Sequence, residues 1–207
     1  MTDPLLADLP KAKRRWARTD PVLHAIAKST PPPPRALSDD EPFHALVSSI
    51  AHQQVSLAAG RAIMGRVDVA ADGRATPEAI LRTGPEALRA AGLSRPKVAY
   101  VLDLAAKTKS GEVEFARFPD MADADIVEEL VAVKGIGVWT AKMFLLFHLD
   151  RPDVSVPEDL GIQIAVAKAY GVRRDRAAKK VAALAPLWSP YNSLANVTLW
   201  NWRRTPA

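Results

Sequence analysis

Apolar residues recur every three or four positions along most of this chain. After Pro42 they fall at the i, i+3, i+4 and i+7 positions of a helix with one buried face: Phe43, Leu46, Val47 and Ile50. The same spacing predicts further helices over residues 57–67 and 95–109 and after Asp123. No run of strict alternation is long enough for a β-sheet. The pattern therefore predicts an all-α fold of many short helices with terse connections.

Prolines and small polar residues mark where these helices begin and end. Asp20-Pro21 and Thr76-Pro77 each combine a capping side chain with a proline suited to the first helical turn. Pro31 to Pro34 form a polyproline spacer through which no helix can continue. The N-terminal segment predicts an amphipathic helix whose charged face carries Lys11, Lys13, Arg14, Arg15 and Arg18.

Composition narrows the class of protein further. At 207 residues, of which 48% are hydrophobic, the chain can form one domain or two small lobes sharing a core. The absence of cysteine excludes disulfides, thiolate metal sites and a cysteine nucleophile, and the four histidines show no ligand spacing for zinc. No apolar run approaches the ~20 residues of a membrane span, so we expect a cytoplasmic protein with no membrane contact. The net charge of +5 favours a polyanionic partner.

A glycine turn lies between two predicted helices at Lys134-Gly135-Ile136-Gly137. Glycine tolerates positive φ and lets another backbone approach closely. The helix after the turn has unpaired N–H groups at its start that can converge on a phosphate oxygen. A lone Gly-x-Gly is nevertheless more often an ordinary turn between helices.

The longer pattern is more specific. Residues 130–141, LVAVKGIGVWTA, resemble the helix-hairpin-helix motif of the base-excision DNA glycosylase superfamily, and VSVPED at 154–159 resembles the segment that ends on its conserved aspartate. The likeness is greatest to the 3-methyladenine DNA glycosylase II (alkylbase) branch, which typically has Pro-Asp-Asp at this point. Residues 43–56 and 92–98 are similar to other signatures of that branch. The resemblance spans roughly residues 40–204, and we expect no N-terminal β-rich domain of the kind that some longer members carry.

This resemblance implies that Asp159 is the catalytic carboxylate. Cleavage of an N-glycosidic bond builds positive charge on the deoxyribose, which a nearby carboxylate stabilises. It can also orient or deprotonate the attacking water. An aspartate after a proline at a helix start is by itself more often a cap, and the two roles can coexist. The motif places Glu158 outside the cleft, so a structural role is expected for it.

The residue two positions after Gly137 distinguishes two reaction types. Superfamily members with lyase activity carry a lysine there, whose amine attacks the sugar to form a Schiff base. This chain has Trp139, and neither Lys134 nor Lys142 matches that position. We therefore expect hydrolysis alone, leaving an abasic site in an intact strand.

Such an enzyme must rotate its target nucleotide out of the duplex. The resemblance implies a base pocket formed by Trp139 and Trp188, with Met143 and Leu160 where some relatives have tyrosines; electron-rich rings favour cationic alkylated purines. Without the motif, each tryptophan would be assigned to the core, as Trp16, Trp200 and Trp202 are. Gln54 occupies the position of the wedge that fills the gap left by the flipped base, the alternative being a loop-capping amide.

The resemblance also assigns the DNA contacts. DNA binding is expected from Gln54 and from the hairpin residues Lys134, Gly135, Ile136, Gly137 and Thr140. Main-chain carbonyls of Val131, Val133 and Ile136 match those that hold a Na⁺ or K⁺ ion in the family, and no other cofactor is expected. The basic residues of 173–180 are interpreted as a solvated helix face with diffuse attraction for DNA.

Together these observations predict two helical lobes with the active-site cleft between them. Residues 51–155 would form a central lobe ending in the hairpin, and residues 1–50 with 157–207 a second lobe carrying Asp159. We expect a monomer that excises 3-methyladenine and 7-methylguanine from duplex DNA. The alternatives are a bifunctional glycosylase-lyase for oxidised bases and a helix-hairpin-helix DNA-binding protein without catalysis.

Overall fold

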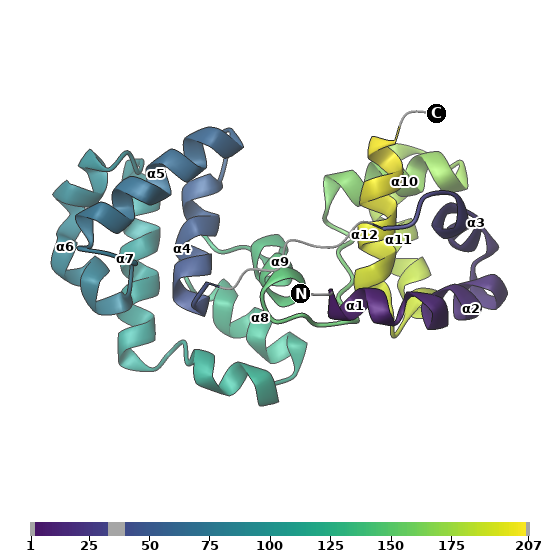
Figure 1. Ribbon diagram of the computed structural model, residues 1–207, viewed down its shortest axis with the longest axis horizontal. Coiled ribbons are helices and arrows are strands. Elements are labelled where there is room, and N and C mark those ends of the chain that lie inside the picture. The colour runs from purple at the N-terminus through teal and green to yellow at the C-terminus, as the bar shows by residue number, and fades with distance from the viewer. Residues whose placement is uncertain (1–2, 33–39, 206–207) are drawn as a thin grey trace. The chain divides into compact units, whose positions relative to one another are not determined.

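The computed structural model describes residues 3–32 and 40–205, and every regular element in these ranges is helical (Figure 1). The elements are α1 (Pro4–Ala7), α2 (Leu9–Thr19), α3 (Pro21–Ser29), α4 (Pro42–His52), α5 (Leu57–Ala70), α6 (Pro77–Ala90), α7 (Arg95–Ser110), η1 (Phe115–Asp120), α8 (Asp123–Val131), α9 (Val138–Phe147), α10 (Leu160–Tyr170), α11 (Arg174–Trp188) and α12 (Asn192–Arg204). The predicted all-α fold is therefore confirmed. Part of the predicted spacer Pro31–Pro34 lies outside the described residues.

The chain divides into two compact units. The central unit comprises residues 38–144, and the terminal unit combines residues 1–37 with residues 145–207. These boundaries differ from the predicted lobes 51–155 and 1–50 plus 157–207 in two places: α4 belongs to the central unit, and residues 145–155 belong to the terminal unit. The apolar face of α4, which includes Leu46 and Ile50, is buried where the helix packs against α5 and α7.

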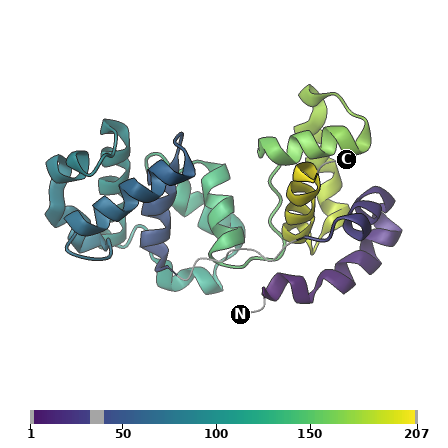
Figure 2. The same cartoon turned by 45° about the horizontal axis from the view of Figure 1, so that its top comes forward.

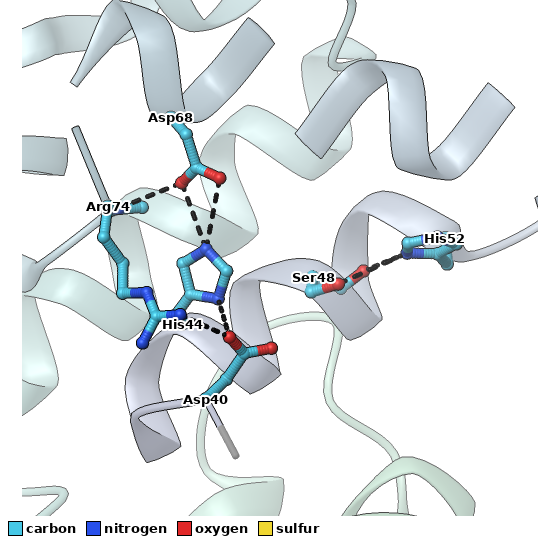
Figure 3. A network of polar contacts seen from close by, with 7 residues as sticks. Asp40, His44, Ser48, His52, Asp68 and Arg74 are labelled. Atoms are coloured by element: carbon cyan, nitrogen blue, oxygen red, sulfur yellow. Dashed lines mark hydrogen bonds and ion pairs between the residues drawn. The ribbon is translucent and has the colours of Figure 1, made fainter. Parts of the chain in front are cut away.

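A buried histidine joins α4 to α5 within the central unit (Figure 3). Nε2 of His44 lies 3.1 Å from Oδ1 of Asp68, and its Nδ1 lies 3.4 Å from Oδ1 of Asp40. Arg74 pairs with the same Asp40 oxygen at 3.0 Å, and Asp68 accepts a hydrogen bond from the N–H of Ala75. The network therefore fixes α4 to α5 and to the turn that follows α5.

In the terminal unit, α12 is the central helix. All of its residues from Asn192 to Leu199 are buried, and it packs against α10, α11 and α3. Figures 1 and 2 both show α12, in yellow, lying against α10 and α11. No helix of the described residues is both long enough and apolar enough to cross a membrane.

Polar side chains on α12 hold the extended segment that leads to Asp159. The hydroxyl of Ser193 donates to the carbonyl of Arg151 at 2.6 Å and accepts from the N–H of Val154 at 3.2 Å. The amide of Asn196 donates to the carbonyl of Val154 at 2.7 Å. The backbone N–H and C=O groups of this extended segment thus find their hydrogen-bond partners in side chains of α12 rather than in a neighbouring strand. These bonds fix residues 151–154 of the segment against α12.

Asp20 connects both ends of the chain within the terminal unit. This carboxylate is 4% exposed, and it caps α3 by accepting the N–H of Leu23 at 3.1 Å. It also accepts the hydroxyl of Tyr170 at 2.5 Å and the ring N–H of Trp188 at 2.7 Å. Burial and the Asp20 carboxylate raise the pKa of Tyr170 well above its usual value, so this hydroxyl remains a donor throughout the neutral range.

Asp20→Ala should therefore lower the free energy of unfolding by about 3–4 kcal/mol, because it removes a helix cap and leaves two buried donors without an acceptor. Urea unfolding followed by circular dichroism measures the change. Asp8→Ala, which breaks only the exposed pair with Lys11, is the matched control and should cost less than about 0.5 kcal/mol. A loss below about 1 kcal/mol for Asp20→Ala would contradict the structural role given to this residue.

Candidate active site

Asp159 lies at the start of α10 and caps that helix. Its Oδ1 accepts the N–H of Ile162 at 2.8 Å, and the side chain is 8% exposed. The N–H of Asp159 donates to the carbonyl of Val156, and the amide of Gln163 donates to the carbonyl of Pro157. The expected capping role is thus confirmed, and it fixes the carboxylate at the end of the extended segment.

Trp200 provides a second donor to the same carboxylate oxygen. Its ring N–H donates to Oδ1 of Asp159 at 2.8 Å, and its ring stacks on Phe147 with centroids 6.0 Å apart. A Cβ added at Gly161 would lie 3.0 Å from Oδ1 of Asp159 and 3.1 Å from the Trp200 ring. The absence of a side chain at 161 therefore lets the carboxylate and the indole meet, and two N–H groups converge on one oxygen.

The hairpin on the central unit joins α8 to α9. Val133 and Ile136 are buried and anchor the turn, whereas Lys134, Gly135 and Gly137 are exposed. The backbone N–H of Lys134 donates to Oδ2 of Asp103 on α7 at 2.9 Å, and the Lys134 ammonium lies 3.3 Å from Oδ1. The turn therefore presents its glycines to solvent from a fixed backbone.

The two glycines of the turn have different roles. Gly135 has φ +79°, and a Cβ built there would lie 2.1 Å from the ring of Tyr100. Gly137 does not have positive φ, and no atom of the described residues lies within 4 Å of a Cβ built on it. Gly135 is thus required by the fold, whereas Gly137 leaves open space at the N-terminus of α9.

The loop between α4 and α5 is attached to this hairpin. The amide of Gln53 donates to the carbonyl of Gly135 at 2.9 Å. The ammonium of Lys97 donates to the carbonyls of Ala51 at 2.8 Å and Gln53 at 2.7 Å, and its partial burial lowers the pKa of this lysine. Gln54 follows with φ +56° and an exposed side chain. A left-handed glutamine is strained, so the fixed loop holds it there.

The predicted pocket residues are found in different environments. Trp139 at the start of α9 is 45% exposed, Leu160 is 58% exposed and Met143 is half-buried. Trp188 has no exposed surface, and its ring N–H is bonded to Asp20. The structure therefore corrects the expectation for Trp188: it is a core residue of the terminal unit, without the exposed ring face that stacking on a base requires.

The residues predicted to contact DNA also differ in solvent exposure. Lys134, Gly135, Gly137 and Gln54 are exposed. Thr140 and Ile136 are buried, so only their backbones could contribute to an interface. The N–H of Ile136 already donates to the carbonyl of Val133 at 3.1 Å.

Trp200 is the main site residue that sequence reasoning missed, because it was assigned to the core. The signal that could have identified it is the 3–4 spacing of Asn192, Asn196 and Trp200, which places one polar face along α12. Gln53, Tyr100 and Gly161 were also missed. Their roles depend on contacts between elements, for which no local pattern exists.

Gly135→Ala should lower the free energy of unfolding by more than about 1 kcal/mol, because alanine is strained at positive φ and its methyl group would meet Tyr100. Gly137→Ala, at a position with normal φ and open space, is the matched control and should stay within about 0.5 kcal/mol of the parent protein. Thermal unfolding of both variants measures the difference. Equal effects at the two glycines would contradict the distinct roles assigned to them.

Comparison with known proteins gives one consistent result. The model of the HhH-GPD superfamily of base-excision DNA repair proteins matches residues 47–190. The DNA-3-methyladenine glycosylase 1 of Schizosaccharomyces pombe is 29% identical over 171 residues, which are 81% of this chain and 75% of that protein. Bacillus subtilis YfjP is 30% identical over 166 residues, or 76% of this chain, but this chain spans only 58% of its length.

Two solved structures are similar over nearly the whole chain. The DNA-3-methyladenine glycosidase of Bacillus halodurans has a TM-score of 0.84 and 33% identity, covering 95% of this chain and 90% of that one. The 3-methyladenine DNA glycosylase of Schizosaccharomyces pombe, in complex with abasic DNA, has a TM-score of 0.78 and 27% identity, covering 92% and 95%. With its hairpin and Asp159 segment both inside the matched region, the chain belongs to the HhH-GPD superfamily of base-excision DNA repair proteins.

Proposed function

We propose that this protein is a monofunctional DNA glycosylase that hydrolyses the N-glycosidic bond of N-alkylated purines, 3-methyladenine and 7-methylguanine, in duplex DNA. The observation that carries the proposal is the Asp159 carboxylate, held at the start of α10 by the N–H groups of Ile162 and Trp200. A buried, oriented carboxylate is the group that stabilises a cationic sugar. Relatives named as 3-methyladenine glycosylases support the choice of substrate.

In this reaction the bond between C1′ and the purine nitrogen breaks, and its electron pair goes to the base. Since an N3- or N7-alkylated purine carries a positive charge, it leaves as a neutral molecule without needing a general acid. Positive charge develops on the sugar, where Asp159 stabilises it. Water then bonds to C1′ and gives up a proton, which Asp159 can accept. The strand remains intact.

The residues of the hairpin favour hydrolysis without strand cleavage. Trp139 takes the place of the lysine nucleophile of the bifunctional enzymes, and the ammonium of Lys134 is paired with Asp103. The exposed ring of Trp139 is suited to stacking on a cationic base. Borohydride trapping of a protein–DNA adduct would instead support the glycosylase-lyase alternative.

In the same proposal, the hairpin binds a backbone phosphate through the N–H groups at the start of α9, beside the open space at Gly137. Lys134 adds positive charge, and the exposed side chain of Gln54 fills the gap left by the flipped base. The partner is damaged duplex DNA, bound by a monomer. The expected location also belongs to this proposal: the cytoplasm and, if the source is a bacterium, the nucleoid.

In the same proposal, a monovalent cation binds where α8 ends and the hairpin turn begins. Helix α8 ends at Val131, and its last carbonyl groups carry partial negative charge that favours a cation. Na⁺ or K⁺ would be held by the carbonyls of Val131, Val133 and Ile136, and it would supply electrostatic attraction for a DNA phosphate.

Asp159→Asn should reduce release of 7-methylguanine from methylated duplex DNA by about 10²–10³-fold or more, because the amide cannot stabilise the cationic sugar. Chromatography of the released bases gives the rate, and anisotropy with labelled duplex should show DNA binding largely retained. Glu158→Gln is the neighbouring control and should keep most of the activity. Excision by Asp159→Asn at the parent rate would refute the mechanism, and no release by the parent protein would favour a DNA-binding protein without catalysis.

Trp200→Phe should lower the single-turnover excision rate by about 10- to 100-fold, because phenylalanine keeps the stacking on Phe147 but removes the N–H that orients Asp159. Affinity for abasic duplex should change little, so the effect falls on kcat rather than on binding. Trp202→Phe, on the same helix, is the control and should retain the rate. Parallel losses of rate and DNA affinity in Trp200→Phe would argue against a positioning role.

A further inference from the structure

The basic residues of α2 line an open hollow in the terminal unit. The hollow has a volume of about 630 Å³ and is lined by Lys11, Arg14, Arg15, Arg18, Pro190 and Tyr191. Its four cationic residues follow the i, i+3, i+4 and i+7 spacing of one helix face. Of the five cations predicted on the charged face of the N-terminal segment, all but Lys13 thus line one concave site.

The charge in this hollow is poorly neutralised. Lys11 pairs with Asp8 at 2.7 Å on the exposed surface. Within the residues that the structure describes, no carboxylate oxygen lies within 4.0 Å of the guanidinium groups of Arg14, Arg15 or Arg18. Nε of Arg15 is buried and has no hydrogen-bond acceptor among the described residues. An anion that entered the hollow would pair with the guanidinium charge that no carboxylate of the described residues neutralises.

The opposite wall of the hollow is fixed in place. Oδ2 of Asp153 accepts the hydroxyl of Ser189 at 2.6 Å, and Oδ1 accepts the amide of Asn192 at 2.6 Å, which fixes the turn carrying Pro190 and Tyr191. The carboxylate of Asp153 is therefore occupied by neutral donors.

Helix α2 is equally well anchored. The ring of Trp16 has no exposed surface, and the hydroxyl of Thr19 donates to the carbonyl of Leu187 on α11 at 2.9 Å. Both walls are thus held by the core of the unit, so the backbone that carries the cations needs little ordering before they bind an anion.

We propose that this hollow binds backbone phosphates of a nucleic acid strand, as a second DNA contact apart from the hairpin in sequence. The choice of DNA as partner rests on the proposed function. Lys11 and Arg18 are about 10 Å apart along the helix axis, so a strand carrying successive phosphates uses all four cations, whereas one free phosphate does not. Arginine also suits this role because its planar group binds phosphate oxygens in pairs.

Such a contact supplies affinity without reading sequence. Phosphate contacts position a protein on DNA and weaken steeply with salt, because each releases condensed counterions. The hollow would therefore increase the time that the protein stays on undamaged duplex. Removal of its cations should change the salt dependence of binding as well as its strength.

The test compares two triple variants that each remove three positive charges from the terminal unit. R14Q/R15Q/R18Q empties the hollow of its arginines, and R174Q/R176Q/K179Q removes exposed cations from α11. Fluorescence anisotropy measures Kd for undamaged duplex over a range of NaCl concentrations. We expect the hollow variant to raise Kd about tenfold or more and to reduce the log–log salt slope by about 2–3, since each phosphate contact contributes about 0.9.

The α11 variant should change Kd by less than about threefold and the slope by less than about 1. Equal effects of the two variants would overturn the proposal in favour of diffuse attraction, and no effect of the hollow variant would overturn it outright. Calorimetric titration with inorganic phosphate distinguishes a site for DNA phosphates from a site for free phosphate. If R14Q/R15Q/R18Q lost phosphate binding but kept its affinity for duplex, the assignment to DNA would be overturned.

Two further measurements keep the result interpretable. The unfolding midpoint of each variant establishes that it is folded, and R14K/R15K/R18K, which keeps the charge, should recover most of the salt slope. The binding assay uses undamaged duplex and requires no base release. Failure of the proposed excision activity is therefore distinguishable from failure of the hollow to bind DNA.

Discussion

The backbone of residues 151–159 must find hydrogen-bond partners without a sheet, and the side chains of α12 supply them. Ser193 and Asn196 bond to the backbone groups of the extended segment, and Trp200 then reaches Asp159 from the same helix. Because buried backbone groups left without partners are costly, this face of α12 fixes where the segment can lie. The position of the Asp159 carboxylate follows from these bonds, so the proposed mechanism depends on α12 as well as on Asp159 itself.

The central unit uses the same principle. Its loop and hairpin are short stretches of irregular backbone, and side chains from neighbouring elements hold them: Gln53 bonds to Gly135, Lys97 to two carbonyls at the end of α4, and Asp103 to the N–H of Lys134. In both units, therefore, irregular backbone is held in place by side chains of neighbouring elements. Rigid support of this kind lowers the entropy lost when a ligand binds.

Much of the fold could be predicted because helix periodicity and capping are local. The 42–51 pattern predicted α4, and Thr76 and Asp20 cap their helices as expected. Gly135 and Asp159 were identified from two short segments, 130–141 and 154–159. What could not be predicted depends on partners distant in sequence. Trp188 and Trp200 occur in similar helical contexts, yet one ring is buried against Asp20 and the other bonds Asp159. The unit to which α4 belongs could not be predicted either, because an apolar helix face does not indicate which elements it packs against.

The discontinuity of the terminal unit has a consequence for how the chain is made. Asp20 is synthesised early, but two of its donors, Tyr170 and Trp188, follow 150 and 168 residues later. The central unit is contiguous and can fold on the ribosome as it emerges, whereas the N-terminal helices must wait for nearly the whole chain. During that interval the Asp20 carboxylate has only the local N–H of Leu23 to accept, and the part of α3 that packs against α12 has no partner. A nascent chain stalled before Tyr170 would therefore have a folded central unit and N-terminal helices that lack their packing partners from the C-terminal part of the chain.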